Sequence, residues 1–78
     1  MIKENIRIAL QELKSQVRDI DLQKIADELN ISRVTIYNYL NGKINDYPLA
    51  IKLIDLIRKE LIRQEQELEK LFHLTVKE

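Results

Sequence analysis

The 78-residue sequence predicts an all-α fold, in which three helices form a head and one long helix follows it. Apolar residues recur at intervals of three and four over most of the chain, which is the period of an amphipathic helix. Residues that favour helix starts precede two of these apolar stretches, and the only Gly and the only Pro stand before the last one. We therefore expect a head at residues 1–45 and, at residues 46–78, a long helix for core packing and dimerisation.

The first helix is expected from residue 2 to about residue 17. Its apolar stripe consists of Ile2, Ile6, Leu10, Leu13 and Val17. A stripe of this width buries a single face of a helix. This helix is expected to close the core of the head, and no functional site is needed there.

Two short helices are expected between residues 21 and 41, with a three-residue turn between them. Asp21 and Ser32 can each cap a helix, because their side-chain oxygens can accept hydrogen bonds from backbone N–H groups of the first turn. Each cap has an apolar pair at the positions of a hydrophobic staple, Ile20 with Ile25 and Ile31 with Ile36. Asn30 and Gly42 stand where the chain leaves the two helices, and both residue types tolerate a left-handed backbone there.

The second of these helices is expected to have an inner face of Ile36, Tyr39 and Leu40. Its outer face is polar and free of acids, and consists of Arg33, Val34, Tyr37, Asn38 and Asn41. Two short helices with such an outer face are typical of a helix-turn-helix that presents a recognition helix to the major groove of DNA.

The same residues carry a resemblance to a known family. The segments Ile25-Ala26, Asn30-Ile31-Ser32, Thr35-Ile36 and Leu40-Asn41-Gly42 resemble the helix-turn-helix of the lambda-repressor-like superfamily. The resemblance is greatest to the LacI-type headpiece, which ends its recognition helix in Leu-Asn-Gly, and the XRE/Cro type is also similar. It covers about residues 20 to 45 and departs from the family at Asn30, where Gly is usual, and at Asp21, where Thr is common. No effector-binding domain follows in the sequence, so no small-molecule effector is expected.

This resemblance implies two sets of DNA-binding residues. Those at base-reading positions are Arg33, Val34, Tyr37 and Asn38. Arg can donate two hydrogen bonds to guanine, Asn can pair with adenine, and Val can contact a thymine methyl group. Those at phosphate-binding positions, which fix register without reading sequence, are Gln23, Ser32, Thr35, Asn41 and Lys43.

The long helix is expected to begin at Pro48, after a connector at residues 43–47. Pro suits the first turn of a helix, because the N–H that it lacks would have no partner there. No further Gly or Pro follows up to about Leu74, which allows a helix of roughly 40 Å. A single break between Arg58 and Arg63 remains open as the alternative to a continuous helix.

The second half of this helix has no obvious partner within the chain, so a homodimer is expected. The residues predicted to form its interface are Ile54, Ile57, Leu61, Leu68, Leu71 and Phe72. In a parallel pair Glu60 would meet Glu65 of the second copy, which is unfavourable. A parallel, an antiparallel and an intertwined arrangement all remain open.

Composition excludes several classes of function. No apolar run approaches the roughly 20 residues of a membrane span, and the N-terminus does not read as a signal peptide. Cysteine is absent and His73 is the only histidine, so neither a disulfide nor a metal site nor another cofactor is expected, and the expected location is the cytoplasm. No partnered nucleophile or phosphate-binding loop is present, so we do not expect an enzyme.

Two hypotheses from different classes remain. The first is a small dimeric, sequence-specific DNA-binding regulator, a repressor of the kind found in phages, plasmids and mobile elements. The second is a protein-interaction module, antirepressor or antitoxin-like, that uses the long helix without binding DNA. The second gains support from a balance of 13 basic and 13 acidic residues, since nucleic-acid-binding domains are often strongly basic.

Overall fold

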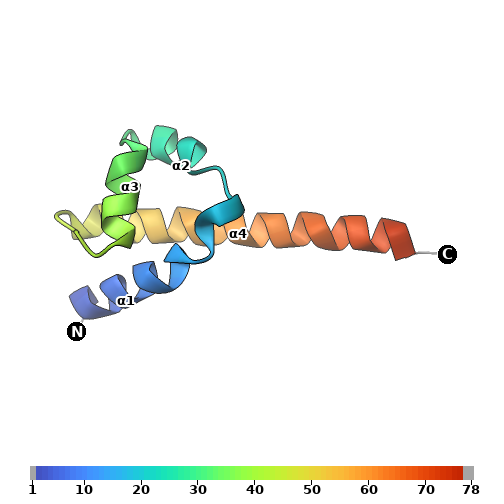
Figure 1. The fold of residues 1–78 in the computed structure, drawn as a ribbon, viewed down its shortest axis with the longest axis horizontal. Coiled ribbons are helices and arrows are strands. Elements are labelled where there is room, and N and C mark those ends of the chain that lie inside the picture. The colour runs from blue at the N-terminus through green and yellow to red at the C-terminus, as the bar shows by residue number, and fades with distance from the viewer. Residues whose placement is uncertain (1, 77–78) are drawn as a thin grey trace.

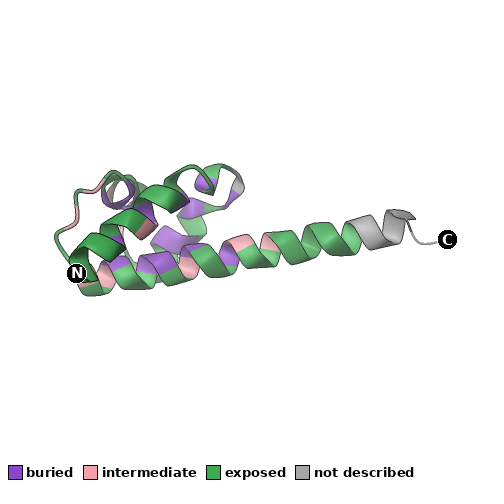
Figure 2. Ribbon diagram, turned by 90° about the horizontal axis from the view of Figure 1, so that it is seen from below, coloured by how far each residue is buried: buried purple, intermediate pink, exposed green. Residues whose placement is uncertain are grey.

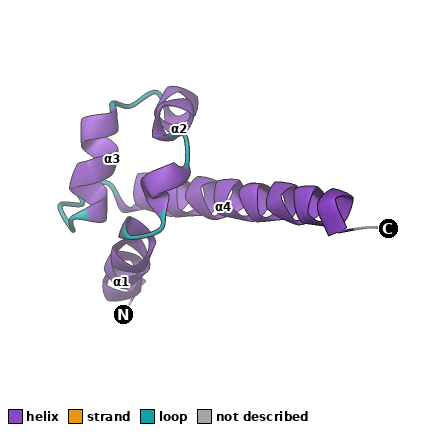
Figure 3. Ribbon diagram, turned by 45° about the vertical axis from the view of Figure 1, so that its right-hand side comes forward, coloured by secondary structure: helices purple, strands orange, loops and turns teal. Residues whose placement is uncertain are grey.

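The computed structural model describes residues 2–76, with the side chains of residues 2–18 and 20–71. Within this range the helices are α1 (Ile2–Lys14), α2 (Leu22–Leu29), α3 (Arg33–Leu40) and α4 (Tyr47–Val76), with a short 3-10 helix, η1 (Val17–Asp19), after α1. The helices α1, α2 and α3 surround the first half of α4, and the second half of α4 extends away from them (Figure 1). The described backbone consists of helices and connecting loops without a strand (Figure 3), which confirms the predicted all-α fold.

The helix α1 ends earlier than its apolar pattern predicts. The side chains of Ser15 and Gln16 both donate hydrogen bonds back to the carbonyl oxygen of Glu12, at 3.4 and 3.3 Å. Such local bonds compete with the continuation of a helix. The chain forms η1 instead, and this tighter turn brings Val17 and Ile20 into the core.

The predicted helix caps on either side of the turn are confirmed. The carboxylate of Asp21 accepts the backbone N–H of Lys24 at 3.2 Å, at the start of α2. The hydroxyl of Ser32 accepts the backbone N–H of Thr35 at 3.2 Å, at the start of α3. Each bond satisfies a backbone donor that has no partner within its own helix.

The exits from α2 and α3 are also alike. Asn30 has a φ of 59° and Gly42 a φ of 92°, the two positive values among residues 2–76. The next residue in each case donates its backbone N–H to the carbonyl oxygen five positions back. Ile31 donates to Ala26 at 2.9 Å, and Lys43 donates to Asn38 at 2.8 Å. This pattern is the Schellman motif, so Asn30 takes the left-handed role that Gly has more often.

One core joins the three helices of the head and the first half of α4. All four helices contribute to it, and the residues that are at most 2% exposed are Leu10, Ala26, Ile36, Tyr39, Leu40, Ala50, Leu53 and Ile57. Figure 2 shows that the buried residues of α4 lie in its first half. The first turns of α4 therefore complete the core that the helices before residue 45 begin.

The helix α4 is continuous over its 30 residues and has no break between Arg58 and Arg63. It begins one residue before Pro48, and the carboxylate of Asp46 accepts the backbone N–H of Leu49 at 3.1 Å. At 1.5 Å per residue its length is about 45 Å. The molecule is 52 Å along its longest axis and 27 Å along the next, so α4 sets its elongated shape.

Candidate nucleic-acid interface

The helix α3 is fixed to the head by three buried side chains. Ile36, Tyr39 and Leu40 are all at most 2% exposed, as the sequence predicts. The hydroxyl of Tyr39 also donates a hydrogen bond of 2.6 Å to the side-chain oxygen of Asn45, in the connector before α4. Because α3 has only two turns, these contacts determine which of its residues face solvent.

The four residues predicted to read bases lie on the exposed side of α3. Arg33, Val34, Tyr37 and Asn38 are all exposed, with Val34 at 66% and Tyr37 at 49%. Exposed apolar groups of this size, beside polar ones on a helix without acids, form a surface that can contact base edges in a major groove.

The five residues predicted to bind phosphates lie around α3 in different environments. Gln23, Ser32, Asn41 and Lys43 are exposed, whereas Thr35 is half-buried. The amide nitrogen of Gln23 donates to Asp27 at 2.8 Å and keeps a second hydrogen, since a primary amide carries two. The hydroxyl oxygens of Ser32 and Thr35 lie 3.1 Å apart, so one hydroxyl donates to the other and a single O–H remains for a phosphate.

A hollow of about 430 Å³ lies beside this surface, between the end of α1, the start of α2 and the outer side of α3. Two of the predicted base-reading residues, Arg33 and Tyr37, line it together with two of the predicted phosphate-binding residues, Gln23 and Asn41. Two cations that the sequence did not single out also line it. These cations are Lys14, at the end of α1, and Arg18, in η1. The excess of basic residues in the first 18 positions was a signal for them, but their place beside α3 depends on the fold.

Residues 6–42 match the family model described as HTH domain. This match supports a helix-turn-helix DNA-binding domain in the segment. The matched segment begins at Ile6, on the buried face of α1, and ends at Gly42, where the chain leaves α3. No curated protein and no solved structure matches the chain. The narrower resemblance to the lambda-repressor-like superfamily stays a prediction.

Two of the six residues predicted to form a dimer interface belong to the core beneath the helix-turn-helix domain. Ile54 is 7% exposed and Ile57 is 0% exposed, because α1 packs on this part of α4. Their assignment to an exposed dimer seam is therefore wrong for this fold. Leu61 is half-buried, whereas Leu68 and Leu71 are 66% and 59% exposed. The sixth residue, Phe72, lies outside the side chains that the structure describes.

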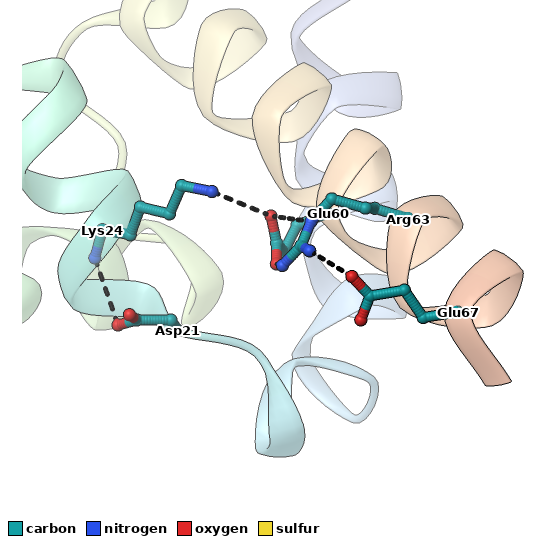
Figure 4. A network of polar contacts seen from close by, with 5 residues as sticks. All are labelled: Asp21, Lys24, Glu60, Arg63 and Glu67. Carbon is teal, nitrogen blue, oxygen red and sulfur yellow. Dashed lines mark hydrogen bonds and ion pairs between the residues drawn. The ribbon is translucent and has the colours of Figure 1, made fainter. Parts of the chain in front are cut away.

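A buried carboxylate joins the helix-turn-helix domain to α4 (Figure 4). Glu60 lies 3.9 Å from the ammonium of Lys24 in α2, and it forms an ion pair with Arg63, one turn further along α4. Arg63 also reaches Glu67 at 2.7 Å. The pKa of Glu60 is lowered, mainly by the hydrogen bond that Arg63 donates to its carboxylate. Burial of the carboxylate opposes this effect, and the positive charges of Arg63 and Lys24 lower the pKa further. The same pairing raises the pKa of Arg63.

Two further observations concern the described part of the chain. None of its helices combines the length and the apolar character needed to cross a membrane. The described residues also contain no group of three or more His, Cys, Asp or Glu side chains that could hold a metal ion.

Proposed function

We propose that this chain is a sequence-specific DNA-binding transcriptional regulator that inserts α3 into the major groove as a homodimer. The outer face of α3 carries the proposal, because it projects polar and small apolar side chains from a helix-turn-helix domain and has no acid. A carboxylate on that face would repel the phosphates on both sides of the groove.

The proposed division of labour follows from side-chain chemistry. Arg33 reads guanine through two hydrogen bonds, Asn38 reads adenine, and Val34 and Tyr37 contact thymine methyl groups and neighbouring bases. The residues around α3 hold the flanking phosphates and fix the depth of the helix in the groove.

A second copy of the chain is proposed to pair through the distal half of α4. The stripe that α4 buries at Ala50, Leu53 and Ile57 continues at the same spacing to Leu68 and Leu71, which are exposed. Exposed leucines along one side of a helix gain about 1.5–3 kcal/mol each when a partner covers them fully. A two-fold dimer would place two copies of α3 on half-sites about one helical turn apart.

Repression follows as the proposed outcome of such binding. A dimer that occupies two adjacent major grooves within a promoter excludes polymerase from the same DNA. Small regulators of phages, plasmids and mobile elements act on this principle, and we place the chain in that class. The proposal therefore assigns the chain a binding function, without catalysis or a bound cofactor.

Selection of bound sites from random duplex DNA tests the proposal. The expected product is an inverted repeat whose half-sites have their centres about 10 base pairs apart. A parallel selection with the Arg33→Ala, Asn38→Ala double variant should give no common motif. Failure of the unmodified protein to retard any duplex at low salt, at about 100 µM, would exclude DNA binding and favour the protein-interaction module.

A further inference from the structure

The hollow beside α3 is lined by three cations from three different elements. Lys14 comes from α1, Arg18 from η1 and Arg33 from α3. Lys14 and Arg18 also line an adjoining hollow of about 510 Å³, on the outer side of α1. The two residues therefore form a basic edge that begins at the proposed recognition face and continues onto the end of α1.

These three cations are available for an external anion. By contrast, Arg7 and Lys24 of the head form ion pairs with carboxylates, as does Lys59 of α4. Across the described residues, no ion pair involves Lys14, Arg18 or Arg33.

One carboxylate, that of Asp21, also lines the hollow. Its oxygen is engaged as the cap of α2, where it accepts the backbone N–H of Lys24 at 3.2 Å. The start of a helix carries a partial positive charge that offsets part of this negative charge. With three cations against one capped acid, the hollow has a net positive charge.

We propose that Lys14 and Arg18 bind phosphodiester groups of the DNA backbone and extend the DNA interface from α3 onto the end of α1. This inference rests on the proposed function, since it concerns the same bound duplex. Gln23 and Asn41 line the same hollow, so the new contacts continue the predicted phosphate-binding set without a gap. The contacts supply affinity and register rather than base preference, because phosphates carry no sequence information.

The test is the salt dependence of binding to a random duplex, which needs no knowledge of the operator. Each phosphate contact contributes about 0.9 to the slope of log K against log salt. The Lys14→Ala, Arg18→Ala variant should lower the magnitude of that slope by about two for each bound copy of the chain, which is about four for the proposed homodimer. It should also weaken binding by about tenfold or more at roughly 0.1 M salt. The variant Lys14→Arg, Arg18→Lys should restore the slope, because it keeps both charges.

A matched control removes two positive charges elsewhere. Lys52→Ala with Lys70→Ala gives the same net charge from two exposed positions of α4. This control should keep the slope of the unmodified protein. Thermal unfolding of each variant checks the fold, and Lys14→Gln, Arg18→Gln replaces the alanine pair if that pair unfolds.

The outcomes separate this inference from the proposed function. A wild-type slope in the folded Lys14→Ala, Arg18→Ala variant overturns the inference and leaves DNA binding by α3 intact. The role of the two residues is then to offset the partial negative charge at the end of α1. An equal loss of slope in the Lys52, Lys70 control also overturns it, because net charge would then explain the effect. Absence of any DNA binding by the unmodified protein overturns the proposed function itself.

Discussion

Two residues with positive φ determine how the chain leaves α2 and α3. Asn30 and Gly42 occupy equivalent positions of two Schellman motifs, although one has a side chain and the other has none. A Cβ added to Gly42 would meet no atom within 4 Å. The requirement for Gly at this position is therefore one of backbone conformation, not of space.

Replacement of Gly42 by Ala should lower the free energy of unfolding by about 1–2 kcal/mol, the cost of a left-handed backbone for an L-residue. Urea denaturation measures this change. Asn30→Gly, at the equivalent position of α2, should leave the protein at least as stable, because Gly adopts this conformation without that cost. Equal losses in both variants would mean that the strain at these positions has been misjudged.

At the recognition surface the prediction separates base readers from phosphate binders. Arg33→Ala and Asn38→Ala should each remove about 1–3 kcal/mol of preference for the selected site over random DNA. Lys43→Ala should weaken binding to both DNAs by the same factor. Titration of all three variants against a specific and a random duplex measures the difference. If all three lose affinity equally on the two DNAs, the base-reading assignment is wrong.

At the scale of elements, the joint between α2 and α4 depends on one buried carboxylate. Glu60 is 8% exposed, lies near Lys24 of α2, and is held by Arg63 of α4. The sequence pattern placed Glu60 beside a possible dimer seam, where it would meet Glu65 of a second copy. In the fold Glu60 is paired with Lys24 and Arg63 of its own chain. Repulsion between Glu60 and Glu65 of a second copy is therefore a weaker argument against a parallel dimer.

The lowered pKa of Glu60 predicts a pH-dependent contribution to stability. Because the pKa is lower in the folded state, the contribution is fully present above the ordinary pKa and is lost as the pH falls through the folded value. Glu60→Gln should therefore destabilise the protein near neutral pH, and the difference from the unmodified protein should shrink by about pH 3. Urea unfolding at both pH values measures this.

The matched control is Glu67→Gln, since Glu67 contacts the same arginine from an exposed position. Exposed ion pairs contribute little to stability, so this variant should unfold nearly as the unmodified protein does. A gap between Glu60→Gln and the unmodified protein that stays constant from neutral to acid pH would contradict the ionic origin of the effect.

At the scale of the whole molecule, contacts with the head bury the first half of α4, whereas the distal half is exposed and available to the proposed second copy. Leu68→Gln should raise the dissociation constant of the dimer about a hundredfold or more, because each of two copies loses a buried leucine. Sedimentation equilibrium measures this constant. Ile8→Gln removes an exposed apolar side chain of α1 that is 44% exposed, and should leave it unchanged. A monomeric unmodified protein, or a Leu68→Gln variant that dimerises normally, would exclude the proposed interface.

The sequence by itself determined the caps, the turn and the outward face of α3. Asp21, Asn30, Ser32 and Gly42 act on backbone groups within five positions of themselves, and the inward residues of α3 follow from helical spacing alone. Each of these features depends on neighbours along the chain, so a single sequence contains the information.

Only the tertiary structure decided which part of the stripe of α4 is buried and which cations lie beside α3. The apolar stripe of α4 has the same spacing in both halves, and only the packing of α1 and α2 on the first half buries Ile54 and Ile57 while Leu68 stays exposed. Lys14 and Arg18 likewise meet Arg33 through the crossing of α1 and α3. Periodicity shows which face of a helix is apolar, but it carries no information on what packs against that face.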